Sequence, residues 1–175
     1  MKAFIHDLNQ ALTYSLEGMY DAEKKLQQAI PGFTKNVTSP ELKKALKNFV
    51  VNHKDCRVKL KRIFSYLLAG PFQRKNTIMD QMVYDAMQSF RLSSQNELKD
   101  VMFVEHLLTI NHYQLSTYHA LKAKADFLEL HAVSDLLEEI IELQKETQHE
   151  LIAVCTLSTR TVLQYEEERA ISAEF

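Results

Sequence analysis

The chain has 175 residues, enough for one domain with a buried core, and 46% of them are hydrophobic, which excludes an intrinsically disordered protein. The net charge is −2 with both signs spread along the chain, which disfavours nucleic acid and anionic membranes as main partners, because both bind concentrated basic surfaces. With only three Gly and three Pro residues, a few long helices are favoured over many short strands.

The first predicted helix runs from about Phe4 to Ile30, because apolar residues recur at alternating intervals of four and three along it. The apolar members of this face are Leu12, Leu16, Met19, Leu26 and Ile30. One polar residue, Glu23, interrupts the face at its middle. Pro31 and Gly32 are expected to end the helix.

The second predicted helix begins after Ser39, which is a good N-cap followed by Pro40 at the first helical position. Its inward face is Leu42, Leu46, Phe49, His53, Cys56, Leu60, Ile63 and Leu67. Gly70 and Pro71 are expected to end it. A shorter helix follows from Thr77 to about Phe90, and its inward residues are predicted to be Ile78, Met79, Met82, Ala86 and Phe90.

Ser94 and Glu97 form a capping-box pattern that opens the third long helix. Its predicted inward face is Val101, Val104, Leu108, Asn111, Leu115, Tyr118 and Ala125. We place the turn into the fourth long helix at Leu128–His131, although it contains neither Gly nor Pro. The predicted inward face of the fourth helix is Val133, Leu137, Ile140, Gln144, Thr147, Leu151 and Val154.

Two long helices, a crossover with a short helix and two more long helices predict an all-α fold, a ferritin-like four-helix bundle. The alternative is an up-down bundle with one decorated loop. We assign residues 1–160 to the bundle and residues 161–175 to a C-terminal extension or tail, which extends the last helix, frays or packs on a partner.

Each long helix carries a polar residue at the middle of its apolar face. These residues are Glu23, Asn52 with its neighbour His53, Asn111 and Gln144. One polar residue per helix at similar depth is how a four-helix bundle builds a central site. The chemistry of the site depends on which residues occupy these positions, and most of them here are amides.

Several strings of the sequence resemble the YciE/YciF family of ferritin-like bacterial proteins. They are Tyr20-Asp21-Ala22-Glu23-Lys24-Lys25-Leu26, Ser39-Pro40-Glu41-Leu42-Lys43, His112-Tyr113 with Tyr118 five residues after Tyr113, and Leu136-Leu137-Glu138-Glu139. The resemblance spans about Leu16 to Val154. It implies a bundle whose centre is lined by carboxylates that hold a pair of metal ions.

The resemblance also implies that most of those carboxylates have been replaced in this chain. Glu23 keeps the family's glutamate on the first helix. The other family ligand positions fall on Ser15, Asn52, Cys56, Asn111, Gln114, Gln144 and Gln148. Amide oxygens can coordinate a hard cation but neutralise none of its charge, so we expect no working dimetal centre.

Without metal, the amides Asn52, Asn111, Gln114 and Gln144 can close a hydrogen-bonded layer among themselves. Glu23 then either stays protonated through desolvation or pairs with His53, and we favour the pair.

Other candidate sites have simpler explanations. The E-x-x-H string from Glu146 to His149 has the spacing of di-iron bundles, but it lies on the face opposite Gln144 and is expected to be solvated. Glu105, His112 and His119 recur every seven residues, which suits either a surface metal site or, more simply, a polar flank. The tyrosines near the layer are Tyr20, Tyr113 and Tyr118, expected to be core residues with bonded hydroxyls rather than redox partners.

The N-terminal segment is interrupted by polar residues and lacks the core of a signal peptide, and no apolar run approaches the roughly 20 residues of a membrane span. We therefore expect a cytoplasmic protein in which Cys56 and Cys155 act as small apolar side chains, although a disulfide remains possible from the sequence.

The function we expect is that of a non-catalytic structural or interaction protein, for which the resemblance suggests a stress-associated role. We expect no cofactor and a homodimer as the oligomer, with Met79, Met82 and Met87 of the short helix at the contact. The alternative is an oxidoreductase or metal store that holds iron or another divalent metal through Glu23 and neighbouring His, Asn and Gln residues. A third possibility is a small polar ligand bound by the amides.

Overall fold

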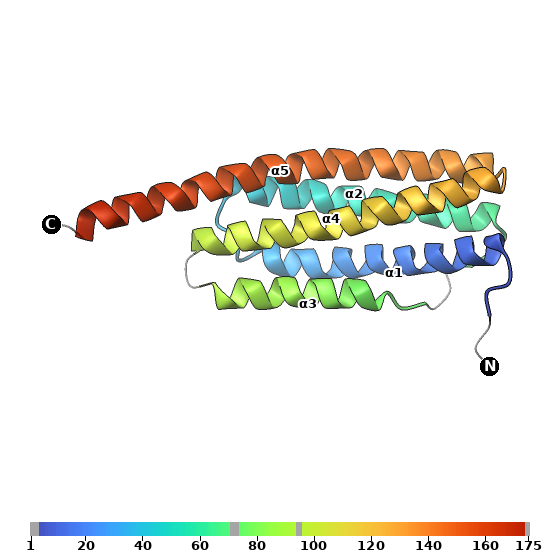
Figure 1. Ribbon diagram of the computed structural model, residues 1–175, viewed down its shortest axis with the longest axis horizontal. Helices are drawn as coiled ribbons and strands as arrows, with labels where there is room; N and C mark the ends of the chain where they lie inside the picture. Colours follow the sequence, from blue (N-terminus) through green and yellow to red (C-terminus); the bar gives the residue numbers. More distant parts are fainter. Residues whose placement is uncertain (1–3, 71–73, 94–95, 174–175) are drawn as a thin grey trace.

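The computed structural model describes residues 4–70, 74–93 and 96–173, which form five α-helices and no strand. The helices are α1 (Leu8–Thr34), α2 (Pro40–Tyr66), α3 (Thr77–Leu92), α4 (Asn96–Phe127) and α5 (His131–Ala173). Both α1 and α5 pack against α2 and α4, and the short α3 lies against α1 and α4 (Figure 1). The predicted all-α, ferritin-like arrangement is confirmed.

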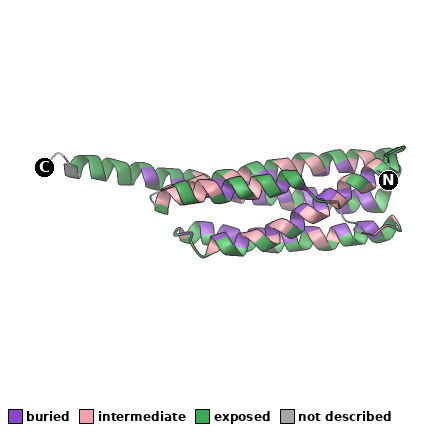
Figure 2. Cartoon of the chain, turned by 90° about the horizontal axis from the view of Figure 1, so that it is seen from below, coloured by how far each residue is buried: buried purple, intermediate pink, exposed green. Residues whose placement is uncertain are grey.

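The predicted inward faces of α1 and α5 are buried throughout, and so is that of α2 up to Ile63 (Figure 2). On α4 the buried face lies slightly off the predicted one. Val101, Leu108 and Leu115 are only half-buried, and the buried positions next to them are Phe103, Leu107 and Ile110. α4 packs against α5, α1 and α3 at once, so its apolar residues are spread over more than one face. The helical periodicity of its sequence therefore indicates its buried face less clearly.

The predicted limits of α1 were wrong at both ends. The helix begins at Leu8, where the side chain of Asp7 accepts a hydrogen bond from the Gln10 N–H, and it continues through Pro31 to Thr34. Pro31 removes only one backbone hydrogen bond in this last turn. The turn is held by Phe33, which is buried and stacks on Phe103 with the ring centroids 4.4 Å apart.

The ends of α2 and α4 use left-handed residues that are not glycine. Leu68 follows α2 with φ 49° and Glu129 follows α4 with φ 56°. In both turns a backbone N–H donates a hydrogen bond to the carbonyl five residues earlier. After α2 the Ala69 N–H donates to the Phe64 carbonyl, and after α4 the Leu130 N–H donates to the Ala125 carbonyl, each over 3.0 Å. The prediction that Gly70 and Pro71 end α2 was therefore wrong for Gly70, since the helix ends at Tyr66, and Pro71 lies outside the described residues. The predicted turn at Leu128–His131 is confirmed.

The crossover helix α3 begins at an N-cap that also ties it to the bundle. Asn76 accepts a hydrogen bond from the Met79 N–H, and its Nδ2 donates to the Gly18 carbonyl and to the Tyr113 hydroxyl. Gly18 lets the guanidinium of Arg74 approach closely, since a Cβ would lie 2.6 Å from it and would displace this side chain. The start of α3 is thus fixed onto α1 and α4. Ser94, the predicted cap of α4, lies outside the described residues.

Two predictions about α3 need correction, one about its inward face and one about the dimer contact. Ile78 is 53% exposed, whereas Met79 is fully buried and cannot contribute to the dimer surface we predicted from the methionines of this helix. Met82 is half-buried and Met87 is 37% exposed. Among the described residues no helix is long and apolar enough to cross a membrane.

Candidate functional site: the polar centre of the bundle

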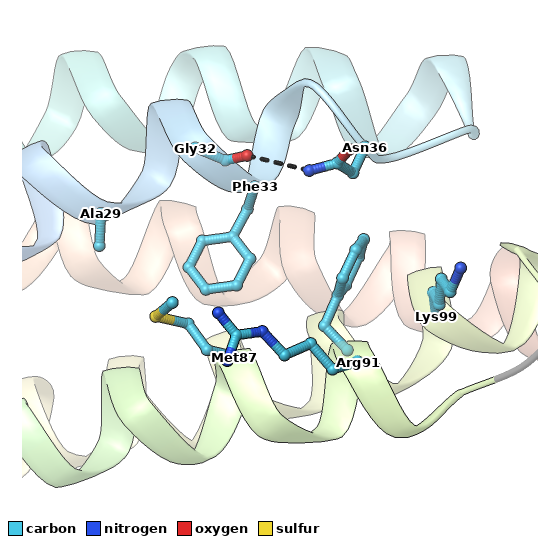
Figure 3. A pocket seen from close by; sticks show the side chains of 8 residues that line it. Ala29, Gly32, Phe33, Asn36, Met87, Arg91 and Lys99 are labelled. Carbon is cyan, nitrogen blue, oxygen red and sulfur yellow. Dashed lines mark hydrogen bonds between the residues drawn. The ribbon is translucent and has the colours of Figure 1, made fainter.

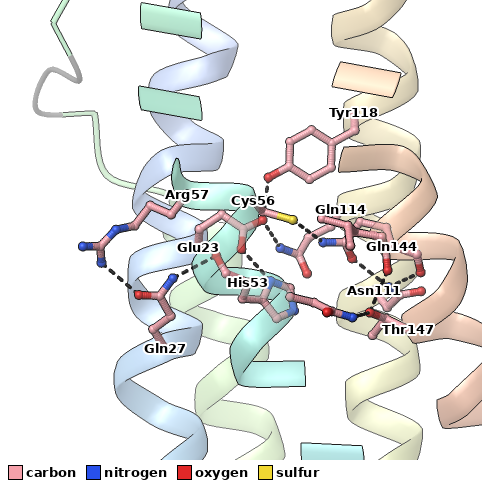
Figure 4. A network of polar contacts seen from close by, with 12 residues as sticks. Glu23, Gln27, His53, Cys56, Arg57, Asn111, Gln114, Tyr118, Gln144 and Thr147 are labelled. Atoms are coloured by element: carbon pink, nitrogen blue, oxygen red, sulfur yellow. Dashed lines mark hydrogen bonds and ion pairs between the residues drawn. The ribbon is translucent and has the colours of Figure 1, made fainter. Parts of the chain in front are cut away.

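Glu23 is fully buried at the middle of α1, and side chains from α2 and α4 hydrogen-bond to its carboxylate (Figure 4). His53 Nδ1 lies 2.5 Å from Oε2, while the Tyr118 hydroxyl and Gln114 Nε2 donate to Oε1 over 2.5 and 2.8 Å. A carboxylate is costly to bury unless it is paired and hydrogen-bonded, so these contacts hold Glu23 in the core. The predicted contact between Glu23 and His53 is present.

An amide pair on α4 and α5 forms the other half of this site. Asn111 Nδ2 donates to Gln144 Oε1 at 2.8 Å and to the Gln144 backbone oxygen at 3.0 Å. Gln144 Nε2 then points at the Cys56 sulfur, 3.7 Å away. We call the seven buried residues of both halves the polar centre: Glu23, His53, Cys56, Asn111, Gln114, Tyr118 and Gln144.

Two residues that the sequence places in this layer lie at its margin. Asn52 is half-buried, and its Nδ2 donates to Thr147 Oγ1 at 3.0 Å. Gln148 is half-buried, with its Nε2 3.1 Å from a ring nitrogen of the exposed His112. One residue along a helix rotates a side chain by about 100°, so Asn52 cannot share the inward direction of His53.

Three buried atoms of the polar centre have no hydrogen-bond partner among the described residues: His53 Nε2, Asn111 Oδ1 and Gln114 Oε1. With the His53 proton on Nδ1, facing Glu23, all three are acceptors. A buried unpartnered polar atom costs about 1–3 kcal/mol. The polar centre therefore lowers the stability of the bundle relative to an apolar layer of the same shape.

The two weak acids next to Glu23 are held in their protonated forms. Burial raises the pKa of the Cys56 thiol well above its usual value, and the nearby Glu23 carboxylate raises it further. The pKa of the Tyr118 hydroxyl is raised well above its usual value by the same two causes, in the same order. Cys56 is thus a buried, inert thiol, as predicted.

The raised pKa of Cys56 predicts a loss of stability at alkaline pH. The thiol ionises in the unfolded chain near pH 8.5 but stays protonated in the folded chain, so unfolding releases a proton above that pH. We expect stability to fall by up to about 1.4 kcal/mol more per pH unit in the wild type than in Cys56→Ala. Urea titrations between pH 8 and 10 measure the difference, and Cys155→Ala is the control that should follow the wild type.

The other candidate metal residues lie at the surface. Glu146 and His149 are exposed, as are Glu105, His112 and His119. Their side chains are separated from Glu23 by the helices that carry them, which confirms that the E-x-x-H string faces away from the centre.

The donors of the polar centre do not fit a pair of divalent ions. Within the described residues, no group of three or more His, Cys, Asp or Glu side chains is placed to hold a metal ion. The single carboxylate already accepts hydrogen bonds from Gln114 and Tyr118 and pairs with His53. The remaining donors are neutral, so the four positive charges of two ions would stay largely uncompensated in the core.

A second buried carboxylate among the described residues, which the sequence did not lead us to expect, is that of Asp100, which is 2% exposed. Its carboxylate accepts hydrogen bonds from the N–H groups of Thr38 and Ser39 and from the Thr38 hydroxyl. It precedes the buried Val104 by four residues and Leu107 by seven, so the helical period could have placed it on the inward face. Its role is to fix the start of α2.

Comparisons with known proteins place this geometry in a family. The family described as "Domain of unknown function (DUF892)" matches residues 7–164. Protein YciF of Escherichia coli (strain K12) is 21% identical over 148 residues, which are 82% of this chain and 87% of YciF.

Two solved structures share the fold. The E. coli stress protein YciF matches with a TM-score of 0.85 at 18% identity, covering 89% of this chain and 99% of YciF. YcfI from Rhodopseudomonas palustris, for which a structural role has been suggested, matches with a TM-score of 0.83 at 19% identity, covering 86% of this chain and 96% of YcfI. Since the family match spans most of the chain, the protein belongs to the DUF892 family of YciF-like, ferritin-like bundles.

Proposed function

We propose that this protein is a ferritin-like bundle that has exchanged its dimetal centre for hydrogen bonds and acts as a non-catalytic structural or interaction protein. The main support for this proposal is that both carboxylate oxygens of Glu23 already have hydrogen-bond partners. These partners are His53, Gln114 and Tyr118. A ligand that must first release three hydrogen bonds is a poor ligand. The description of YciF as a stress protein supports a stress-associated role.

Metal titration tests this proposal. We expect purified protein exposed to Fe²⁺, Mn²⁺ or Zn²⁺ and then desalted to retain far less than one equivalent by elemental analysis. Gln114→Glu combined with Gln144→Glu restores two carboxylates beside Glu23 and should raise retention, because the added charges neutralise the ions. Gln28→Glu with Gln81→Glu, at two exposed positions, adds the same charge at the surface and is the matched control.

Two results would contradict the proposal. Near-stoichiometric metal in the wild type that disappears in Glu23→Gln would show a working centre. Unchanged metal retention in the variant with Gln114→Glu and Gln144→Glu would show that these positions do not surround a metal-sized site.

A second candidate function, a single-ion metal protein, is favoured by the three unpartnered acceptors of the polar centre. His53 Nε2 is a donor that borderline divalent ions prefer, and the amide oxygens Asn111 Oδ1 and Gln114 Oε1 are donors that harder divalent ions such as Mn²⁺ accept. The same titration separates the two functions, because retention at this site is lost in Asn111→Leu but persists in Glu23→Gln.

Self-association is the partner that the surface supports best. The C-terminal part of α5 extends past the ends of the other helices (Figure 1). It exposes a series of apolar side chains: Leu157, Leu163, Tyr165 and Ile171. Several exposed apolar side chains on one overhanging helix are a surface that a second chain could cover. We expect sedimentation equilibrium to give the mass of a dimer, and a monomer at micromolar concentration would contradict this.

A further inference from the structure

A cavity lies away from the polar centre, where α1 and α3 end and α4 begins (Figure 3). Its volume is about 510 Å³, which is within the range of small-molecule sites. The described residues of its wall include apolar and cationic side chains and no carboxylate. This combination is the basis of the inference.

The apolar wall of the cavity is preformed. Phe33 stacks on Phe103 and meets Phe90 edge-on, with the centroids of Phe33 and Phe90 6.1 Å apart. Phe33 and Phe103 are buried, so the cluster cannot collapse to close the cavity. Met87, whose flexible side chain adapts to ligands of different shape, lies beside Phe33.

The cationic side chains of the cavity wall form no ion pair with any residue that the structure describes. Arg91 makes no hydrogen bond or ion pair with any residue that the structure describes. Lys99 makes only a long contact of 3.4 Å with Asn96 Oδ1, and its ammonium lies 6.0 Å from the Phe90 ring centroid. Both cations are therefore available to an incoming anion at the edge of the aromatic cluster.

We propose that this cavity binds an amphipathic small molecule with one anionic head group, such as a medium-chain carboxylate. The chain lies on Phe33, Phe90 and Met87, and the head pairs with Arg91, while Lys99 adds a second positive charge to the cavity wall. A cationic ligand is repelled by both charges, and a purely polar anion leaves the aromatic wall unused. The site is independent of the polar centre and of any metal.

Calorimetric titration with three ligands of equal chain length tests the charge requirement. We expect decanoate to bind with a stoichiometry of one per chain, decanol to bind at least about tenfold more weakly, and decylammonium to show no binding. Equal affinity for decanoate and decanol would overturn the proposal, and so would no heat with decanoate up to millimolar concentration.

Variants locate the binding to this cavity. Gly32 lines the wall, and a Cβ added there meets nothing within 4 Å, so Gly32→Leu occupies the cavity without disturbing the fold. We expect Gly32→Leu to abolish decanoate binding and Arg91→Gln to weaken it roughly tenfold. Lys47→Gln removes an exposed lysine on α2 and should bind like the wild type.

Unchanged binding in Gly32→Leu would place the ligand elsewhere and overturn the proposal. If another copy of the chain fills the cavity instead, decanoate does not bind and Gly32→Leu lowers the sedimentation mass, which would also overturn it.

Discussion

Replacing His53 by Leu should lower the free energy of unfolding at neutral pH by about 3 kcal/mol, because the buried Glu23 carboxylate loses one of its hydrogen-bond partners. His53 is the partner of Glu23 Oε2, and neither side chain reaches water. Leu fills most of the imidazole's volume, so the loss measures the pairing rather than a cavity. Urea denaturation with linear extrapolation gives the value.

A double-mutant cycle separates the pair from other effects of the substitution. Glu23→Gln keeps an oxygen for Tyr118 and Gln114, so its own cost should be smaller. In a Glu23→Gln background, His53→Leu should cost much less than in the wild type, because no buried charge is left unpaired. A cost below about 1 kcal/mol for His53→Leu alone would show that Glu23 does not depend on this contact.

Replacing Asp100 by Ala should cost about 2–3 kcal/mol, the second largest effect we expect. Its carboxylate is buried and accepts from the Ser39 N–H at 2.7 Å and from the Thr38 hydroxyl at 2.8 Å. Hydrogen bonds to a charged acceptor are about twice as strong as neutral ones, and their loss frees the residues that start α2. Thermal or urea unfolding measures the change.

Asp100→Asn is the matched comparison, because it keeps one acceptor oxygen while removing the charge. We expect it to lose about half as much stability as Asp100→Ala. If both variants stay within 0.5 kcal/mol of the wild type, water replaces the carboxylate and the start of α2 does not depend on α4.

The starts of α2 and α3 could be predicted from the sequence, at Pro40 and Thr77, whereas the start of α1 at Leu8 was missed although Asp7 caps it. Ser39 and Pro40 begin α2 as expected, and the Ser39 hydroxyl accepts from the Leu42 N–H. Helix ends depended on tertiary packing instead. Leu68 adopts a left-handed conformation that its side chain disfavours. The packing of Phe33 extends α1 past Pro31. Neither feature can be predicted from the local sequence.

The polar centre could be predicted as a set of residues but not as a network. The helical period places Glu23, His53, Asn111 and Gln144 inside. The hydrogen bonds among these side chains depend on how α4 is rotated about its axis relative to α5. This rotation cannot be predicted from the sequence. The cavity near Arg91 was missed for the same reason, since it forms only where three helix ends meet.

The most direct test is a crystal structure of protein grown and crystallised with excess iron, manganese and zinc, with anomalous maps recorded at each metal edge. We predict no anomalous peak at the polar centre and a direct contact between His53 Nδ1 and Glu23. A peak within coordination distance of Glu23, with His53 turned away from it, would contradict the claim that hydrogen bonds have replaced the metals.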